Sequence, residues 1–358
     1  MDIRELDQNF QFGNISRENL QWIDRYHPCV EINGAADIDE FFRISKEKAA
    51  PLTYAVQCIS ESTAGVRMRF RTNASYVALK AVIRWSDDMS HMPRSGSGGF
   101  DLYAGKAGEI PAFRKTFMPD NGRVEVSGEA WLPDGEWWDV VIHFPLYNGV
   151  RELAVGLPSD CQLQPPLPFA LPAPVVFYGS SITQGGCASR PGNMYPTIVC
   201  RELGLDQYNL GFSGSAKGEP EVADYIAGLN MAALVLDYDY NADSVEHLKA
   251  THEPFFTRIR QVHPTLPIIL MSKPNVDNEE ELSAQRCAVV RRTYENALAR
   301  GDKHVWFIDG ADLFGSAFRD CCTVDGCHPN DFGFVRMAQT VLPVLCTALN
   351  LSRQEDAK

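Results

Sequence analysis

Long apolar stretches are missing from this sequence. None approaches the roughly 20 consecutive apolar residues that a membrane-spanning helix needs. The first seven residues, MDIRELD, lack the basic start and the apolar run of a secretory signal. We therefore expect a cytoplasmic protein that has no membrane partner.

Positive charge is also scarce. The chain has 33 Lys and Arg residues against 46 Asp and Glu residues, and its formal net charge is −13. Nucleic acids and anionic membranes bind basic surfaces, because their phosphates repel an acidic one. We therefore expect no nucleic-acid partner. The charge says nothing positive about the substrate.

Paired cysteine motifs are absent as well. The chain has ten cysteines, but without a secretory signal a disulfide framework is not expected at this length. Cys321, Cys322 and Cys327 form a cluster, but their spacing is not a paired C-x-x-C, and no second pair with nearby histidines completes the four ligands of a zinc site. We expect free thiols, no metal and no cofactor.

The first half of the chain is rich in short β-favouring segments and poor in helical periodicity. Val66–Arg71 alternates between apolar and charged residues, which is typical of a strand with one buried and one solvated face. The pattern predicts an antiparallel, jelly-roll-like β-sandwich over residues 1–162. Its expected strands are Thr53–Ile59, Val66–Arg71, Tyr76–Arg84, Gly99–Ala104, Val124–Ala130 and Trp138–Phe144.

A proline-rich connector separates this half from the next. Residues 163–174 hold five prolines in twelve positions, and proline cannot donate a backbone hydrogen bond to a sheet. A chain of 358 residues is also long for one core. We therefore expect two domains, 1–162 and 175–358, joined by this extended segment.

Beyond the connector the period changes, because short apolar strands alternate with longer helical segments. This predicts a parallel sheet covered on both faces, in a flavodoxin-like three-layer α/β/α sandwich. The expected strands are Val175–Tyr178, Tyr208–Gly211, Ala233–Asp237, Ile268–Met271 and Val305–Ile308. The expected helices are roughly Met194–Leu203, Glu219–Ala227, Ser244–Gln261, Glu279–Ala299 and Phe332–Leu349.

The first strand of this half leads into the sequence GSSITQGG at 179–186. A buried strand that stops at Gly179 presents Ser181 at the carboxyl edge of the sheet, where open α/β sheets bind ligands. We predict that Ser181, rather than Ser180, is a nucleophile. A serine hydroxyl then needs a base that takes its proton and a group that orients the base.

Only the segment VDGCHPND at 324–331 offers both partners after Ser181. Asp325 precedes His328 by three residues, a spacing that lets the carboxylate reach one ring nitrogen while the other faces the serine. We predict a triad of Ser181, His328 and Asp325. A D-x-x-H pair also occurs by chance, and a histidine near a helix start can simply cap or pack.

Acyl transfer also needs hydrogen-bond donors for the oxyanion that develops on the substrate. The candidates are the backbone N–H of Ser181, the backbone N–H of Gly214 and the side-chain amide of Asn241. Glycine suits a turn whose N–H approaches a ligand closely. Gly214 could equally be a plain turn glycine, and Asn241 a residue at a helix N-terminus.

The chain resembles the SGNH, or GDSL-like, hydrolase superfamily. Five residues follow the order of its four blocks: Ser181, Gly214, Asn241, Asp325 and His328. GFDLY at 99–103 is similar to the G-x-D-L-Y signature of a branch with an N-terminal β-sandwich. The resemblance implies a flavodoxin-like fold that acts on carboxylic esters.

Two blocks depart from the family pattern. Ser180 stands where Asp is usual in the first block, and DYNA at 239–242 keeps the asparagine of G-x-N-D but loses its glycine and its terminal aspartate. The second departure leaves the role of Asn241 open.

The resemblance implies a metal-independent serine esterase with the triad and oxyanion donors named above. We expect short acyl groups, acetyl first, on a carbohydrate, since relatives include carbohydrate deacetylases and no apolar segment suggests a lipase groove. Trp137, Trp138 and Tyr147 could form a sugar-facing wall. Two alternatives stay open: an acyltransferase with a hydroxyl acceptor, and a carbohydrate-binding protein with an inactive hydrolase fold. The oligomeric state also stays open.

Overall fold

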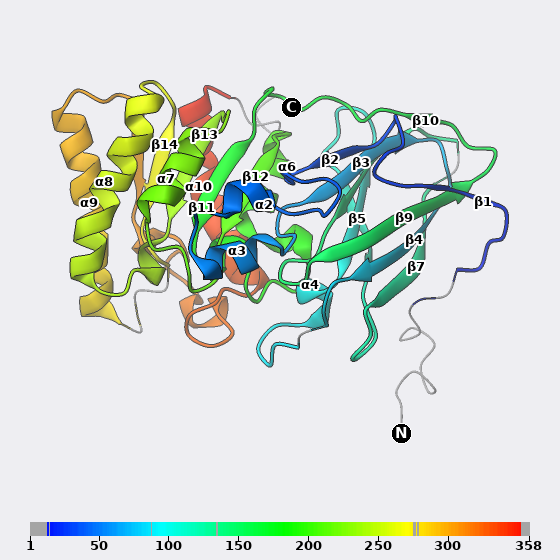
Figure 1. The fold of residues 1–358 in the computed structure, drawn as a ribbon, viewed down its shortest axis with the longest axis horizontal. Coiled ribbons are helices and arrows are strands. Elements are labelled where there is room, and N and C mark those ends of the chain that lie inside the picture. Colours follow the sequence, from blue (N-terminus) through cyan, green and yellow to red (C-terminus); the bar gives the residue numbers. More distant parts are fainter. Residues whose placement is uncertain are drawn as a thin grey trace. The chain divides into compact units, whose positions relative to one another are not determined.

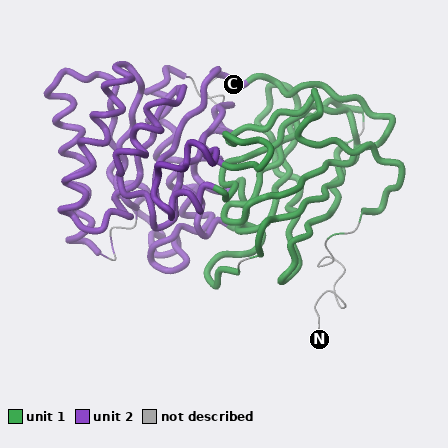
Figure 2. The backbone as a smooth tube through the Cα atoms, in the orientation of Figure 1, with its two compact units in different colours: residues 1–42, 61–168, 189–192 green, residues 43–60, 169–188, 193–358 purple. Residues whose placement is uncertain are grey.

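A computed structural model describes residues 13, 15–86, 88–133, 135–274, 277 and 279–351. The chain divides into two compact units, which Figure 2 colours separately. Unit 1 contains residues 1–42, 61–168 and 189–192, and unit 2 contains residues 43–60, 169–188 and 193–358.

These units differ from the expected domains in two segments. The main division falls between Pro168 and Phe169, inside the proline-rich connector, but residues 43–60 belong to unit 2 and residues 189–192 to unit 1. For residues 43–60 the physical reason is burial, because Ile44, Leu52 and Val56 are part of the apolar core of unit 2. A boundary drawn from proline content cannot register such exchanges.

Unit 1 is the predicted antiparallel β-sandwich. One sheet has the order β1 (Leu20–Ile23), β9 (Val150–Pro158), β4 (Tyr76–Ile83), β7 (Glu125–Trp131). The other has the order β10 (Leu163–Gln164), β3 (Arg67–Thr72), β8 (Trp138–His143), β5 (Phe100–Gly105), β6 (Ala112–Phe117), and β2 (Glu31–Asn33) pairs with β3. A short helix, α4, spans Arg94–Ser97. Alternate residues of the strands, such as Val77 and Leu79, form the core of the unit.

Strand β3 differs from its expected half-solvated pattern. Arg67 and Arg69 are buried at 3% and 7% exposure, although their neighbours Met68 and Phe70 occupy the core face. Arg67 donates to Gly65 O at 2.7 Å, and Arg69 donates to the carbonyl of Leu167. The second face of β3 is therefore covered by other residues of the protein rather than exposed to water.

Unit 2 contains the predicted five-stranded parallel sheet (Figure 1). Its order is β12 (Gln207–Gly211), β11 (Val175–Gly179), β13 (Ala233–Asp237), β14 (Ile268–Met271), β15 (Val305–Ile308). Its helices are α2 (Lys46–Ala49), α3 (Tyr54–Ser60), α5 (Ser181–Gln184), α6 (Tyr195–Leu203), α7 (Pro220–Ala227), α8 (Val245–Val262), α9 (Glu280–Ala299) and α10 (Asp331–Leu349). Its 3-10 helices include η3 (Asp239–Asn241), η5 (Gly310–Asp312) and η6 (Arg319–Cys322), whereas η2 (Pro191–Asn193) lies mostly in the segment 189–192 of unit 1.

The helices of unit 2 form the outer layers. Helix α8 contacts α7 and α9, whereas α10 contacts α6 and strand β15. The strands β11, β12 and β13 between them are wholly buried and mostly apolar, as expected of a parallel sheet that is covered on both faces. The predicted flavodoxin-like three-layer sandwich is confirmed.

The segment predicted as a strand at Thr53–Ile59 is instead helix α3, Tyr54–Ser60. The prediction rested on its Val and Ile content. Val56 and Ser60 are four residues apart and are the buried residues of this helix, which is the helical rather than the extended spacing. Packing onto the core of unit 2 therefore outweighs the weak β-propensity of the segment.

Helix α10 is more apolar than the sequence suggested. It has 19 residues, and its most apolar 18-residue window has a mean hydropathy of 1.5, so by length and composition alone it could cross a membrane. Arg336 and Gln339 interrupt its apolar residues, which is why no uninterrupted apolar run was evident. Half of its most apolar window is buried within the protein, so core packing accounts for this composition.

Gly211 at the end of β12 is a sharp test of how tightly the sheet edge packs. A Cβ atom at this position would lie 2.2 Å from the backbone nitrogen of Gln184. We expect Gly211→Ala to lower the free energy of unfolding by about 1–3 kcal/mol or more, because backbone has to move. Urea unfolding followed by circular dichroism measures the change.

Gly228 provides the matched control for this substitution. Its φ is −81°, and an added Cβ would meet nothing nearer than 3.4 Å. Gly228→Ala should therefore stay within about 0.5 kcal/mol of the parent protein. Equal unfolding midpoints for the two variants would contradict the packing argument.

Candidate active site

The candidate nucleophile follows the central strand β11. Gly179 pairs with Gly211 of β12 on one side and with Asp237 of β13 on the other. A Cβ atom at Gly179 would lie 2.1 Å from Thr183 Oγ1, so only glycine fits this turn. Ser181 begins helix α5 immediately afterwards and is 5% exposed.

Ser180 has a structural role in this turn. Its Oγ accepts the N–H of Ile182 at 3.1 Å and caps α5, which is a common role for serine at a helix start. The preceding sheet edge is held by Asp237, whose backbone oxygen accepts the N–H of Ser180 at 3.2 Å. Ser180 therefore serves as a helix cap, a role different from that predicted for Ser181, the candidate nucleophile.

A buried hydrogen-bonded cluster lies under the same turn. Thr183 Oγ1 donates to Asp237 Oδ2 at 3.0 Å, and the hydroxyl of Tyr195 donates to the same oxygen at 3.3 Å. Burial raises the pKa of Asp237 well above its usual range, with the neighbouring Asp239 carboxylate adding to the effect. This cluster fixes α5, and with it the position of Ser181.

The three predicted triad residues meet in space. Ser181 Oγ lies 2.9 Å from His328 Nε2, and His328 Nδ1 lies 2.8 Å from Asp325 Oδ2. These contacts join the two ring nitrogens to a hydroxyl on one side and a carboxylate on the other. The arrangement has the geometry required of a nucleophile, a base and an orienting group.

The loop before α10 builds its half of this arrangement locally. Asp325 Oδ1 accepts the N–H of Cys327 at 3.0 Å and that of His328 at 2.7 Å. Gly326 between them has φ +83°, which a residue with a side chain rarely adopts. The N–H of Val324 donates to His328 O at 2.9 Å and closes the turn. The three-residue spacing predicted from sequence is thus realised as a tight turn.

These contacts shift the ionisation of both partners. Partial burial acts to raise the pKa of Asp325, but the backbone and ring hydrogen bonds from His328 outweigh it and leave the pKa below its usual value. The Cys327 side chain has the largest effect on His328; burial opposes it and Asp325 adds to it, so the pKa of His328 rises to about 9. Protonated imidazole is therefore stabilised in the free protein.

This ionisation predicts a pH profile. A base must be neutral to accept a proton, and with a pKa of about 9 only about 1% of His328 is neutral at pH 7. We expect kcat/KM for a soluble acetate ester to rise about tenfold per pH unit from pH 6 and to level off near pH 9. Initial rates across that range measure it.

Stability changes in the opposite sense: His328 stabilises the fold fully below its ordinary pKa of 6.5 and loses this contribution as the pH passes through about 9.

Cys327→Ser separates the two influences on the histidine. Without the thiol, Asp325 remains the main group that raises the His328 pKa, so the acidic limb should move to lower pH. Cys321→Ser is the matched control, since Cys321 is an exposed thiol of the same loop. An unmoved limb in Cys327→Ser would contradict the assignment.

The two remaining predicted residues follow the strands on either side of β11. Gly214 comes after β12, is exposed and has φ +66°. Asn241 ends the 3-10 helix η3 after β13, and its Nδ2 donates to Phe212 O at 3.0 Å. An amide NH₂ group has two N–H bonds, and this contact uses one of them. The structure thus joins Asn241 to the loop that contains Gly214.

Two buried amides that the sequence did not single out brace this loop. Gln184 Oε1 accepts the N–H of Ser213 at 2.9 Å. Asn209 Nδ2 donates to Thr183 O at 2.7 Å, and its Oδ1 accepts the N–H of Gly211 at 2.9 Å. Both tie the nucleophile helix to the end of β12. Asn209 has one sequence signal, a polar residue inside a buried strand, whereas Gln184 on α5 has none.

Among the described residues of unit 2, one set has donor atoms suited to a metal. Single ligand atoms of Asp325, Cys327 and His328 lie within 4.8 Å of one another. Two of the three already hydrogen-bond to each other in the triad, so a metal here would compete with the proposed chemistry. All ten cysteines are free thiols.

Comparisons with known proteins match both halves of the chain to described families. Residues 172–346 match the family described as GDSL-like Lipase/Acylhydrolase, and residues 20–163 match GxDLY, the N-terminus of SGNH-hydrolase-type esterases. No curated protein sequence matches the chain.

Several solved structures are similar over most of the chain. A protein from Bacteroides ovatus assigned as a GDSL-like lipase has a TM-score of 0.82 at 28% identity, over 94% of this chain and 99% of its own. A salicylyl-acyltransferase from a tetracycline biosynthetic pathway has 0.74 at 20% identity, over 92% and 98%. An acetyl xylan esterase from Butyrivibrio proteoclasticus has 0.56 at 14% identity, over 92% and 100%. At these identities, the second and third show a shared fold alone.

Proposed function

Because the chain belongs to the GDSL-like lipase/acylhydrolase family of SGNH hydrolases, in the branch with the GxDLY N-terminal domain, we propose that it is a serine esterase for short acyl groups on carbohydrates. The observation that supports this most is the hydrogen-bonded series from Ser181 through His328 to Asp325, with contacts of 2.9 and 2.8 Å. Such a series is what acyl transfer by serine requires.

The proposed reaction has two halves. Ser181 Oγ attacks the ester carbonyl while His328 Nε2 takes the hydroxyl proton, and the alcohol leaves with that proton. Water then attacks the acyl-enzyme, His328 takes a proton from it, and the acid is released with the serine restored. Asp325 holds Nδ1 and favours the imidazolium that forms at each step.

The oxyanion of each tetrahedral intermediate needs donors near Ser181. The proposal assigns the N–H of Ser181, the N–H of Gly214 and the free N–H of Asn241 to this role. Strands β12 and β13 flank β11, so the loops that follow them lie at the same sheet edge as the nucleophile. Donors fixed in advance at such a place stabilise the developing charge without reorganising.

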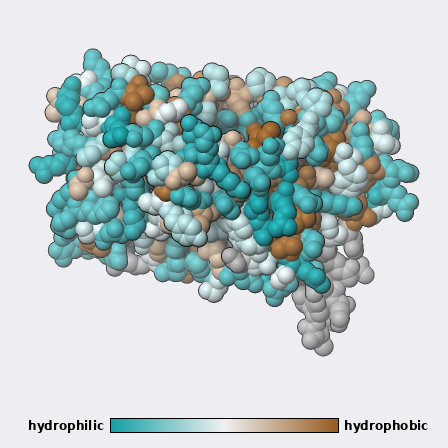
Figure 3. Space-filling model, in the orientation of Figure 1, coloured by the Kyte–Doolittle hydropathy of each residue, from teal (hydrophilic) through white to brown (hydrophobic). Residues whose placement is uncertain are grey.

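Acetyl on a carbohydrate is the proposed substrate class. One protein with the same fold is described as an acetyl xylan esterase, and the face shown in Figure 3 is mainly hydrophilic with scattered apolar residues. Trp138 is 4% exposed in the core of unit 1, so of the three aromatic residues expected to face a sugar, only Trp137 and Tyr147 remain candidates. We place the reaction in the cytoplasm, on acetylated oligosaccharides.

Acetate release tests this proposal. The protein is incubated with acetylated xylan, mannan and pectin fragments in excess EDTA, because the proposed mechanism uses no metal. Enzymatic measurement of acetate should show release from at least one fragment. If the protein cleaves p-nitrophenyl acetate but releases no acetate from any glycan, the proposed esterase activity stands and the proposed carbohydrate substrate is wrong.

An acyltransferase is the second candidate, since a protein with the same fold at a TM-score of 0.74 is described as a salicylyl-acyltransferase. In that reaction an acceptor hydroxyl replaces water in the second half. Product analysis by mass spectrometry, with and without sugar alcohols as acceptors, separates the two. Labelling of Ser181 by a fluorophosphonate separates both from an inactive binding protein.

A further inference from the structure

Arg43 is a fully buried cation from the first half of the sequence that lies in unit 2. It is 0% exposed. Its Nη1 donates to Gly211 O at 2.7 Å and to Asn209 O at 3.1 Å, and its Nη2 donates to Ile59 O at 2.7 Å. Burying a guanidinium is costly unless its donors are satisfied. The carbonyls that satisfy Nη1 belong to Asn209 and Gly211, at the end of strand β12.

That strand, β12, is an edge strand of the sheet. Asn209 and Gly211 are two residues apart, so their carbonyls point in the same direction, away from β11. Unpaired edge carbonyls normally face water or a neighbouring chain. One guanidinium, with its rigid set of donors, binds both, and the carbonyl of Arg43 in turn accepts the hydroxyl of Tyr208 from the same strand. Arg43 therefore fixes the last three residues of β12.

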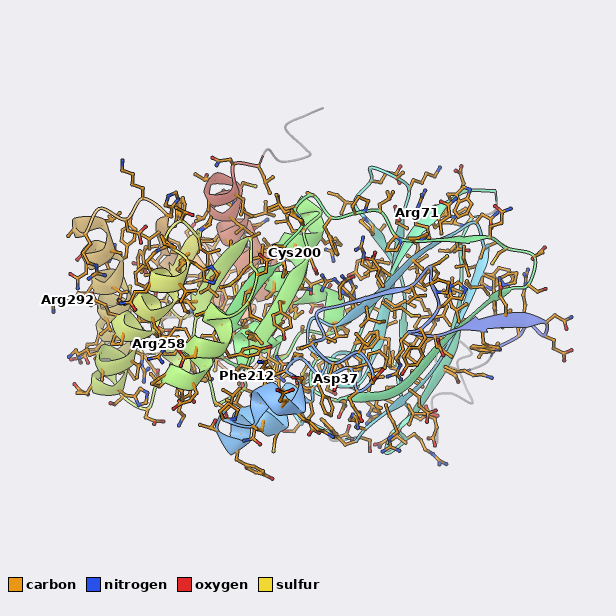
Figure 4. All side chains as sticks on the ribbon, turned by 45° about the horizontal axis from the view of Figure 1, so that its top comes forward. Asp37, Arg71, Cys200, Phe212, Arg258 and Arg292 are labelled. Carbon is orange, nitrogen blue, oxygen red and sulfur yellow. The ribbon has the colours of Figure 1, made fainter. Side chains whose placement is uncertain are left out.

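Phe212 connects this anchor to the candidate oxyanion donors. The guanidinium carbon of Arg43 lies 5.1 Å from the centroid of the Phe212 ring, and Figure 4 labels Phe212 beside the blue helices of residues 43–60. Phe212 donates its N–H to Gly179 O at 2.8 Å. Its carbonyl accepts Asn241 Nδ2 at 3.0 Å and the N–H of Ser215 at 2.9 Å.

We propose that Arg43 is a positioning residue for the oxyanion donors, which holds the end of β12 and Phe212 so that the Gly214 turn and Asn241 are set relative to Ser181. This inference rests on the proposed function. Arg43 touches neither substrate nor triad in this account. Its effect passes through Gly211 O and the Phe212 ring to the loop that follows.

The proposal predicts a loss in turnover rather than in binding. Removing one oxyanion donor outright typically costs about 10²–10³ in kcat, so a misplaced donor should cost about 10–100-fold. Arg43→Lys keeps the charge but not the two-carbonyl fork, and Arg43→Gln keeps donors without charge. For both we expect that fall in kcat on p-nitrophenyl acetate, with KM within about threefold.

A boronic acid provides the discriminating measurement. Phenylboronic acid forms a tetrahedral adduct with an active-site serine and places an oxygen where the oxyanion develops. Its inhibition constant should rise in parallel with the loss in kcat/KM, while the pH limb set by His328 stays in place. A general loosening of the fold would instead disturb the pH limb and KM together.

Arg258→Lys is the control, because Arg258 is an exposed arginine of unit 2 that pairs with Asp224 on α7. It should keep parent kinetics. If Arg43→Lys does not fold, Phe212→Leu removes the ring beneath the guanidinium and should give a smaller fall in kcat with the same boronate signature. Unchanged kcat in a folded Arg43 variant, or a loss confined to KM, overturns the inference. Absence of ester hydrolysis by the parent protein would instead overturn the proposed function.

Discussion

Ser181→Ala is expected to lower kcat for p-nitrophenyl acetate by at least about 10⁴-fold, because loss of the nucleophile from a serine triad ordinarily costs several orders of magnitude. The physical reason is specific to Oγ, which lies 2.9 Å from the ring nitrogen that would take its proton. KM should change little, since a buried methyl-for-hydroxymethyl exchange leaves the pocket shape almost intact. Steady-state kinetics with enzyme concentrations raised to the micromolar range can measure the residual rate.

Ser180→Ala is the matched control for this experiment. It removes a hydroxyl from the adjacent position, which is also buried, and its expected effect is on stability. Loss of the cap on α5 should cost about 1 kcal/mol, with kcat within a few-fold of the parent. If Ser180→Ala abolished turnover and Ser181→Ala retained it, the assignment of the nucleophile would be reversed.

Asp325→Asn is expected to lower kcat by about 10³–10⁴-fold. The carboxylate accepts hydrogen bonds at both oxygens, from the backbone N–H groups at one and from His328 Nδ1 at the other. An amide keeps one acceptor and presents NH₂ at the other position. If the NH₂ faces the ring, it favours the tautomer that puts the proton on Nε2, where Ser181 needs an acceptor.

The pH profile of this variant gives an independent readout. Without the carboxylate, imidazolium is less favoured, so the acidic limb of kcat/KM should move below that of the parent. Asp320→Asn is the control, because Asp320 is an exposed aspartate in η6 of the same loop. Parent-like turnover in Asp325→Asn would mean that some other group orients His328.

The second half of the fold was the more predictable from sequence. Helix α9 was expected at Glu279–Ala299 and lies at Glu280–Ala299, and β13 and β14 have their expected bounds. Buried parallel strands are short apolar runs with few alternatives, and long helices between them leave little choice of layer. The sheet order followed from the fold class rather than from any residue.

The first half was less predictable, for a physical reason. Residues 53–59 are ambiguous between strand and helix, and what decided for α3 was a long-range partner, the core of unit 2. Strands β6 and β9 were not expected, although β9 is nine residues long. In antiparallel sandwiches, burial depends on cross-strand neighbours that local pattern does not reveal.

In the candidate site, the order of residues in the sequence was enough to predict which side chains form the Ser–His–Asp arrangement. Ser181, Asp325 and His328 meet as expected because each follows a strand at one sheet edge or precedes the last helix. The contact of Asn241 with Phe212 O, and the interaction of the Cys327 side chain with the ring of the adjacent His328, depend on loop geometry that no spacing rule specifies. Arg43 was missed because a buried arginine far upstream resembles any surface arginine in a sequence.

The membership of residues 43–60 in unit 2 also affects the order in which parts of the protein can fold during synthesis. A ribosome releases these residues more than a hundred positions before strand β11 (Val175–Gly179). Their apolar side chains, including Val56, then wait without the sheet that later covers them. At about 5–20 residues per second this interval lasts several seconds or more. Nascent chains should therefore expose α3 to chaperones, and a fragment that starts after the connector should lack part of its own core.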